Sequence, residues 1–336
     1  MNKNKRQRSS RARYQAIRQR KKYKKDRIQR IINRNENKPT FLYLQSIPPT
    51  RILAPKELSL IDNSNEFVSY LKAIKNTSKN GHPVLIFISK VEKLTYETIA
   101  VLISFLNSKE IKNNQIHGNA PDDINLKKIF TESGFYSFVT CETNFKSSVD
   151  NILHEESNFK VKPEIAGRVT DLIEKKLQSN ISEDEIEALY NIFIELMSNT
   201  HHHADNSKYG HTKWWLFAHC ADDEINITFI DLGIGIFKSR VVKEKVKKLG
   251  INLKLMSNLV LVDDLLDGKI QSRIDIDNEI RGKGLPQILE YSKMDIFETF
   301  YIVTNDILVN LKNRDRQKLT NNFKGTMINL TIKNKF

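Results

Sequence analysis

The second half of the chain limits the fold most strongly, because two helical patterns there are followed by a series of strand patterns. Residues 163–178 and 182–204 both carry apolar residues at the i, i+3, i+4, i+7 spacing of an amphipathic helix. Ser182 and Glu185 have the spacing of a capping box, which predicts the start of the second helix. The strand patterns cover residues 212–220, 224–233, 298–305, 307–313 and 325–334. The first two predict an antiparallel hairpin, and the whole order predicts an α+β fold, a two-layer sandwich with helices on one face of a sheet.

The first half of the chain predicts a smaller α/β domain over residues 58–145. A helical pattern at 65–76, an uninterrupted apolar run of strand length at 82–89 and a second helical pattern at 95–110 follow one another. A short strand, a turn and a helix beginning near Asp122 or Asp123 complete it. Residues 35–57 contain four prolines and no apolar period, so they predict a linker.

The net charge of +14 comes from the N-terminal tail. Residues 1–34 hold 15 Lys or Arg and the single acidic residue Asp26, whereas the rest of the chain has 39 basic and 39 acidic residues. Blocks of like charge often serve as solvated interaction tails, and a polyanion gains by releasing counterions to such a tail. Ile28, Ile31 and Ile32 share one helical face. The tail is expected to be disordered or helical, and nucleic acid, another polyanion and a merely solubilising role all remain open for it.

The remaining composition predicts a cytoplasmic protein. The chain has only Cys141 and Cys220, so a disulfide framework and a cysteine-based zinc site are excluded, which fits a reducing compartment. No apolar run approaches the roughly 20 residues of a membrane-spanning helix, and the N-terminus has no signal-peptide core.

Three polar or glycine-bearing segments in the second half are candidates for chemistry. Glu195 and Asn199 are four residues apart and share one helical face, where a carboxylate can hold a water and a carboxamide oxygen can bind Mg²⁺. "DLGIGI", residues 231–236, ends a predicted strand, where glycines permit close approach of a ligand and a carboxylate can accept from an exocyclic amine. "RGKGLPQILEYSK", residues 281–293, opens a helix whose N-terminal N–H groups, with two basic side chains beside them, can bind an anion. The Walker loop and the long Rossmann glycine fingerprint are absent from the sequence.

The order of these segments, closed by "FKGT" before the last strand, resembles the GHKL ATP-binding fold of histidine-kinase catalytic domains, gyrase and mismatch-repair ATPases, heat-shock chaperones and anti-sigma-factor kinases. The resemblance covers residues 160–336 and implies the Bergerat fold, with ATP and Mg²⁺ as ligands. It implies that Glu195 positions or activates water, that the Asn199 oxygen binds Mg²⁺ and that Asp231 accepts the adenine amine. The other nucleotide-binding residues that it implies are His203, Gly233, Gly235, Arg281, Gly282, Lys283, Gly284, Leu285 and Thr326. Residues 237–280 would then form a mobile ATP lid.

The first domain resembles the STAS domain of anti-sigma-factor antagonists, on the segments "HPVLIFISKVEKLTYETIAVLISFLNSKE" and "APDDINLKKIFTESGFYSF". Any other small α/β domain explains the pattern equally well. The regulatory phosphoserine position falls near Glu97, which a serine kinase cannot modify, although Thr95 and Thr98 flank it. This departure favours a docking role for the domain.

The leading functional hypothesis is a Mg²⁺-dependent ATP-binding protein that hydrolyses ATP slowly or acts as an ATP-gated signalling switch on a protein partner. A serine/threonine protein kinase of the anti-sigma-factor type is the alternative among enzymes. The third hypothesis is a sensor that binds nucleic acid through residues 1–34 and whose nucleotide site only gates assembly. Autophosphorylation at His154 is disfavoured because the rest of a phospho-acceptor motif is missing. Many proteins of this fold are homodimers, but nothing in the sequence identifies an interface.

The run of His201, His202 and His203 does not by itself predict a metal site. Successive helical residues point about 100° apart, so three adjacent imidazoles cannot converge on one ion. His203 lies four residues after Asn199 and is the one member expected to approach the phosphates.

Overall fold

The computed structural model describes residues 48–108, 111, 116–141, 152–158, 161–203, 213–221, 224–239, 241–242, 257–271 and 284–333. The predicted tail and residues 35–47 of the predicted linker lie outside these residues. The described residues form helices together with parallel and antiparallel sheets. This mixture is compatible with the predicted α+β class. Residues Pro49–Phe336 group into one unit, to which the described parts of both predicted domains belong.

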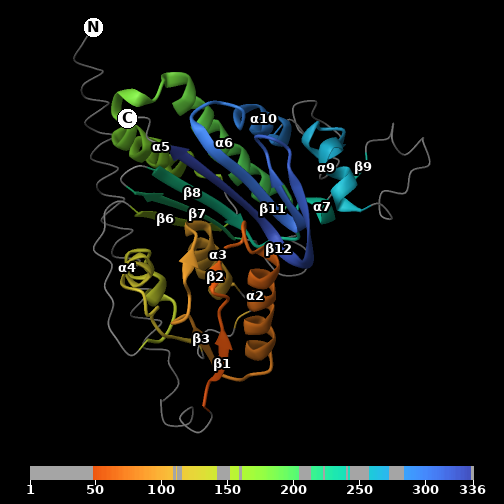
Figure 1. Cartoon of the computed structure of the whole chain (residues 1–336). Coiled ribbons are helices and arrows are strands. Elements are labelled where there is room, and N and C mark those ends of the chain that lie inside the picture. The colour runs from red at the N-terminus through yellow and green to blue at the C-terminus, as the bar shows by residue number, and fades with distance from the viewer. Residues whose placement is uncertain are drawn as a thin grey trace. The chain divides into compact units, whose positions relative to one another are not determined.

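Among the described residues of the N-terminal half there are a three-stranded parallel sheet and three α-helices (Figure 1). In chain order its elements are β1 (Thr50–Leu53), β2 (Glu57–Leu58), α2 (Ser64–Lys79), β3 (Val84–Phe87), β4 (Lys93–Leu94), α3 (Tyr96–Leu106), β5 (Ile116–Gly118), α4 (Ile124–Glu132) and the short 3₁₀ helix η3 (Phe135–Ser137). The sheet order is β1-β3-β5, and β2 pairs with β4. Helix α4 begins next to Asp123, as the prediction of a start near Asp122 or Asp123 requires, and the Asp123 carboxylate caps it by accepting from the Leu126 N–H at 2.8 Å. Strand β1 and the first residue of β2, Glu57, lie inside the segment that the sequence predicts to be a linker.

The C-terminal half is built on a five-stranded antiparallel sheet of order β11-β12-β8-β7-β6. Its strands are β6 (Ile152–Asn158), β7 (Lys213–Cys220), β8 (Glu224–Asp231), β11 (Phe297–Asn310) and β12 (Arg316–Lys333). The predicted hairpin of β7 and β8 is confirmed. Strand β6 precedes the predicted start of the domain at residue 160 and forms an edge of the same sheet.

The prediction of two separate strands over residues 298–313 is wrong, because β11 runs through Asn305 without a break. The ladder to β12 shifts register on both sides of Asn305, which adopts a left-handed backbone with φ 55°. A bulge of this kind bends a strand without ending it. Strand β12 also begins at Arg316, before the predicted start at Gly325.

Six helices and two short strands accompany this sheet in the described residues: α5 (Pro163–Leu177), η4 (Gln178–Asn180), α6 (Glu183–His203), α7 (Ile236–Ser239), β9 (Val241–Val242), α9 (Asn258–Leu266), β10 (Ile270–Gln271) and α10 (Gly284–Tyr291). The capping box at the start of α6 is confirmed. The Ser182 N–H donates to the Glu185 carboxylate at 2.8 Å, and the Glu185 N–H donates to the Ser182 hydroxyl at 3.3 Å.

The five-stranded sheet is buried on both faces, which the sequence did not predict. Along β7, Trp214 and Leu216 belong to the hydrophobic core with α5, α6, α9 and α10, whereas Trp215 and Phe217 belong to the core with α2 and α3. This alternation follows from the period of two in a strand. Helices α2 and α3 of the N-terminal half therefore pack on the face opposite to α5, α6 and α10 (Figure 1). The described helices α5, α6, α9 and α10 of the C-terminal half share one core on one face, as expected, and the N-terminal half supplies the helices on the other face.

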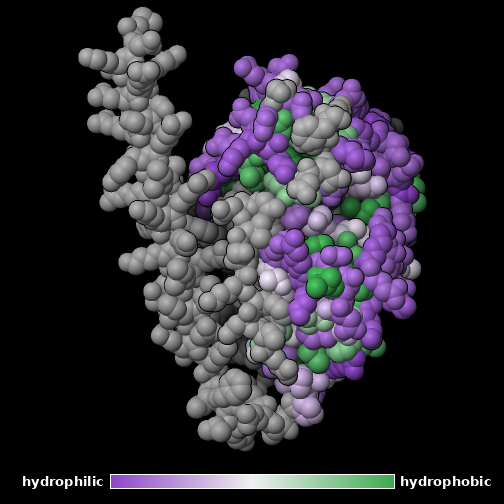
Figure 2. Space-filling view, turned by 60° about the vertical axis from the view of Figure 1, so that its left-hand side comes forward, coloured by the Kyte–Doolittle hydropathy of each residue, from purple (hydrophilic) through white to green (hydrophobic). Residues whose placement is uncertain are grey.

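The surface in Figure 2 is mostly hydrophilic, and its apolar residues form separate small patches. Among the residues that the structure describes, no helix has both the length and the apolar character needed to cross a membrane.

Candidate functional site

Helices α6 and α10 bring three of the predicted site residues together. Gly284 begins α10, and a Cβ atom built on it would lie 2.4 Å from Glu195 Oε2 and 3.7 Å from Asn199 Nδ2. Tyr291, two turns further along α10, accepts hydrogen bonds at its hydroxyl from Asn191 at 3.3 Å and Gln287 at 2.8 Å. Asn191 lies one turn before Glu195 on α6, so this contact fixes α10 against the Glu195 face of α6. The missing side chain of Gly284 is what allows the close approach.

The carboxyl group of Glu195 is partly desolvated. The side chain is partly buried, and burial raises the pKa of its carboxyl above the ordinary value. A raised pKa makes a carboxylate a stronger proton acceptor. Its neighbour Asn199 is also partly exposed, and its carboxamide supplies one oxygen that a hard cation such as Mg²⁺ can bind.

A second group of predicted residues forms at the end of β8. The Asp231 carboxylate accepts from the Gly233 N–H at 2.9 Å and from the hydroxyl of Thr326, which lies directly opposite on β12. Desolvation nevertheless dominates and raises the pKa of Asp231 to about 6. Two donors therefore hold the carboxylate in place. When the carboxylate is ionised, it can accept a further hydrogen bond from a ligand.

Gly325 is required by the backbone of this second group. It has φ 98°, and a Cβ atom at this position would lie 2.0 Å from the Asp231 carbonyl oxygen. Only glycine fits such a left-handed and crowded position. The predicted "FKGT" segment thus places Thr326 beside Asp231 because Gly325 lets β12 approach the end of β8.

Two residues of this region were missed in the sequence analysis. Thr304 and Asn305, both buried in β11, make side-chain hydrogen bonds to the loop that contains Gly235. The one available signal is the polar "TND" at 304–306 inside an otherwise apolar run, at the point where the sequence predicts one strand to end and the next to begin.

Several predicted residues cannot be placed in the site. Arg281, Gly282 and Lys283 lie outside the described residues, as do residues 243–256 and 272–280 of the predicted lid. The backbone of His203 ends α6, but its side chain is outside the described part. Leu285 is described, and it packs against the core beneath α10.

Part of the predicted lid is packed rather than free. Four apolar side chains of α9 are buried in the C-terminal core: Leu261, Val262, Leu265 and Leu266. Arg316 also pairs with Asp263 of this helix at 2.6 Å. Within the predicted lid of residues 237–280, α9 is therefore packed against the C-terminal core in this structure, and its mobility stays a prediction.

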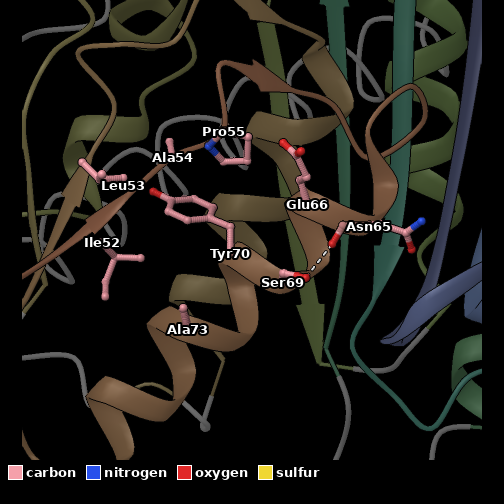
Figure 3. Close-up of a pocket in the computed structure, with 9 residues that line it drawn as sticks. All are labelled: Ile52, Leu53, Ala54, Pro55, Asn65, Glu66, Ser69, Tyr70 and Ala73. Carbon is pink, nitrogen blue, oxygen red and sulfur yellow. Dashed lines mark hydrogen bonds between the residues drawn. The ribbon is translucent and has the colours of Figure 1, made fainter.

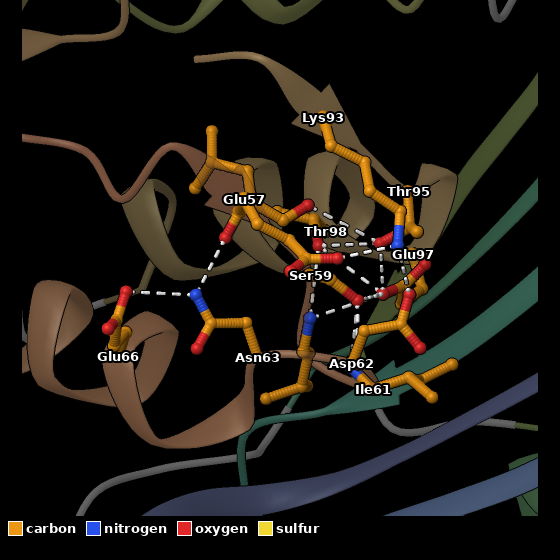
Figure 4. Close-up of polar contacts among 12 residues, drawn as sticks. Glu57, Ser59, Ile61, Asp62, Asn63, Glu66, Lys93, Thr95, Glu97 and Thr98 are labelled. Carbon is orange, nitrogen blue, oxygen red and sulfur yellow. Dashed lines mark hydrogen bonds and ion pairs between the residues drawn. The ribbon is translucent and has the colours of Figure 1, made fainter. Parts of the chain in front are cut away.

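Glu97, at the position equated with a phosphoserine, is a buried carboxylate in a cluster of donors at the start of α3 (Figure 4). It is 1% exposed, and its Oε1 accepts from the Ser59 and Thr98 hydroxyls at 3.3 Å, from the Leu60 N–H at 3.2 Å and from the Thr95 hydroxyl. Burial raises the pKa of Glu97 despite these donors. These hydrogen bonds join the turn after β2 to α3, and the hydroxyls of both Thr95 and Thr98 already donate to Glu97.

A pocket of about 460 Å³ lies in the N-terminal half, between β1 and α2 (Figure 3). Its lining includes Ile52, Leu53, Pro55 and the ring of Tyr70, and it contains none of the predicted site residues. It therefore does not bear on the site at α6, β8 and α10.

The described arrangement can position a water with a carboxylate, offer oxygen ligands to a cation and accept a hydrogen bond at a strand end. Among the described residues, no three His, Cys, Asp or Glu side chains are grouped as an all-protein metal site requires. A cation held by Asn199 together with phosphate oxygens does not need such a group, since Mg²⁺ is commonly bound by few protein ligands and by substrate phosphates. No protein-family model matches the sequence, and no curated protein is similar enough in sequence to count as a match.

Proposed function

We propose that residues 160–336 are a GHKL-type ATP-binding domain of the Bergerat fold, and that the protein binds ATP with Mg²⁺ and hydrolyses it slowly or uses it as a switch. The single observation that carries the proposal is the contact of Gly284 with Glu195. These residues are 89 positions apart in the chain, and they belong to the two predicted segments that must meet at the phosphates.

The residues present fit an ATP–Mg²⁺ complex. The space that a Cβ atom of Gly284 would fill lies beside a carboxylate and a carboxamide. The carboxylate can accept a proton from a reacting water, and the carboxamide oxygen can bind Mg²⁺. In the proposal Asn199 holds the ion, and Gly284 and Leu285 begin the helix whose N-terminus faces the phosphates. When bound, Mg²⁺ neutralises charge on the phosphate oxygens. Arg281, Gly282, Lys283 and His203 are proposed as further phosphate contacts on the sequence resemblance.

The adenine side is proposed to lie at the end of β8. Asp231 accepts the exocyclic amine, with Thr326 and the Gly233 N–H holding its carboxylate in place. Gly233 and Gly235 let the base approach the backbone. Since GTP has a carbonyl where ATP has the amine, this arrangement selects adenine over guanine.

Glu195 is proposed as the general base that accepts a proton from water attacking the terminal phosphate. Its raised pKa suits this role, because the proton acceptor then matches the working pH more closely. The products are ADP and inorganic phosphate.

The test uses the full chain in two measurements. Isothermal titration calorimetry with ATP and Mg²⁺ is expected to show binding that weakens at least tenfold in Asn199→Ala, while binding of adenosine alone is unchanged. Hydrolysis followed with γ-labelled ATP is expected to release free phosphate and to fall by roughly a hundredfold or more in Glu195→Gln. Absence of ATP binding by the unmodified chain contradicts the proposal, and label on a protein Ser or Thr instead of free phosphate favours the kinase alternative.

The N-terminal part, residues 58–145, is proposed to be a STAS-like docking domain and not a phosphorylated switch. The support is that Glu97 is buried among hydroxyl donors and that Thr98 is fully buried.

A further inference from the structure

Strand β11 has an irregular backbone at Asn305, whose side chain contacts the first glycine loop, residues 234–237. The register with β12 shifts on both sides of this residue, and its φ is 55°. Asparagine tolerates this conformation better than most residues, because its short polar side chain can bond locally. Asn305 is nevertheless 1% exposed, so its carboxamide must find partners inside the protein.

Both ends of the Asn305 carboxamide bind the backbone of the glycine loop. Its Oδ1 accepts from the Phe237 N–H at 3.0 Å, and its Nδ2 donates to the Ile234 carbonyl at 2.9 Å. Gly235 lies between these two contacts with φ 82°, and a Cβ atom there would lie 2.5 Å from Asn305 Nδ2. The carboxamide therefore occupies the space that a side chain at position 235 would need.

Thr304 adds a third contact and connects the loop to the Asp231 group. Its Oγ1 accepts from the Ile236 N–H at 2.9 Å and donates to the Gly325 carbonyl at 3.1 Å. It also lies 3.3 Å from Thr326 Oγ1. Thr326 in turn donates to Asp231. Thr304 therefore connects the loop to β12 through the Gly325 carbonyl, one residue before the threonine that bonds the proposed adenine acceptor.

We infer that Asn305 is a positioning residue for nucleotide binding, which holds the first glycine loop, residues 234–237, in the shape that receives the adenosine part of ATP. The inference rests on the proposed function. It assigns Asn305 no contact with the nucleotide, since its polar atoms are engaged by the loop backbone.

A merely structural asparagine is the competing explanation, and the same sheet offers one as a control. Asn329 in β12 is 2% exposed, and its Nδ2 donates to Asn226 Oδ1 and to Thr228 Oγ1, both at 3.0 Å. Loss of its carboxamide removes a similar number of buried hydrogen bonds and leaves the glycine loop untouched.

The test compares adenosine and MgATP binding by calorimetry in three variants of the full chain. Asn305→Gly keeps the left-handed backbone and removes both contacts, so we expect both ligands to bind roughly 10- to 100-fold more weakly, the loss of two hydrogen bonds. Asn305→Asp keeps the acceptor for the Phe237 N–H and sets an oxygen against the Ile234 carbonyl, so a smaller loss for both ligands is expected. Asn329→Ala is expected to lower the melting temperature without changing either affinity.

Hydrogen exchange gives a second readout that needs no nucleotide. The Phe237 amide should exchange at least tenfold faster in Asn305→Gly than in the unmodified chain, and at an unchanged rate in Asn329→Ala. Adenosine affinity that is unchanged in Asn305→Gly, or lowered equally in Asn329→Ala, overturns the inference alone. If the unmodified chain binds neither ligand, the proposed function fails and the inference fails with it.

Discussion

Gly284→Ala is the substitution that most sharply separates the proposed chemistry from the fold. The new Cβ atom would stand 2.4 Å from Glu195 Oε2, whereas ordinary contacts of a Cβ atom begin at 3.4 Å. The carboxylate must therefore move by about 1 Å. It can do so, because the contact is with the far end of a flexible side chain and the nearest other atom, in the same carboxylate, is already at 3.4 Å.

The magnitude follows from these distances. A misplacement of about 1 Å in a catalytic group can lower the rate about 100-fold, which corresponds to about 2.7 kcal/mol of transition-state stabilisation. The stability of the fold should hardly change, because Gly284 is the first residue of α10, where alanine and glycine differ by less than in a helix interior, and the displaced Glu195 rotamer costs about 1 kcal/mol. The melting temperature is then expected to stay within about 4 °C of the unmodified chain.

The assay is steady-state phosphate release from ATP, with thermal unfolding measured on the same samples. Gly167→Ala is the matched control, since Gly167 lies in α5 and a Cβ atom there meets nothing within 4 Å. We expect this control to melt about 2–4 °C higher and to hydrolyse ATP at the unmodified rate. Undiminished hydrolysis by Gly284→Ala would refute the role of Glu195, and a collapse of stability would refute the geometric argument.

The remaining predictions concern four other features. The pKa of Asp231 is raised to about 6, so nucleotide binding measured by calorimetry should weaken as the pH falls through about 6 and the acceptor becomes protonated. A carboxyl whose pKa is raised on folding lowers the free energy of unfolding once it ionises, so Asp231 destabilises the folded protein above about pH 6. Asp231→Asn should therefore stabilise the ligand-free protein at pH 7.5 by at most about 3 kcal/mol and remove adenine binding. If the free energy of unfolding contributed by Asp231 rises with pH between about 4 and 6, the sign is wrong. Gly325→Ala should lower the melting temperature by roughly 10 °C, because a backbone oxygen lies 2.0 Å from the new Cβ, and an unchanged melting curve would show that this strand approach is wrong. Asn65→Ala removes the acceptor for the Thr320 N–H at 2.7 Å, so it should cost about 1 kcal/mol in denaturant unfolding with unchanged ATP affinity. If the tail binds nucleic acid, deletion of residues 1–34 should abolish a binding that falls steeply with salt in a filter assay, and binding that survives the deletion removes the tail from that role.

Local signals predicted much of the C-terminal half. The capping box at Ser182 and the hairpin of β7 and β8 depend on neighbouring residues, so the sequence specifies them directly. The family resemblance implies that Gly284 and the α6 pair belong to one nucleotide site, and the contact of α10 with α6 through Tyr291 brings them close together.

Features that depend on distant residues could not be predicted in the same way. β11 remains continuous at Asn305 because the loop backbone at Phe237 satisfies its carboxamide, and no local pattern reveals that partner. The sequence around Trp215 and Phe217 is consistent with a strand that is covered on one face and with a strand that is covered on both. The packing of α2 and α3 in one core with these two side chains decides between the two arrangements. The carboxylate of Glu97 likewise reads as a surface charge in sequence and is buried through Ser59 and Thr98.

The most direct test of the proposed function is a crystal structure of the full chain with Mg²⁺ and a non-hydrolysable ATP analogue. We predict that the adenine amine donates to Asp231, that the Asn199 oxygen binds the ion and that the phosphates lie at the start of α10 beside Glu195. An analogue bound elsewhere, with Asp231 and Asn199 free of ligand, would contradict the account.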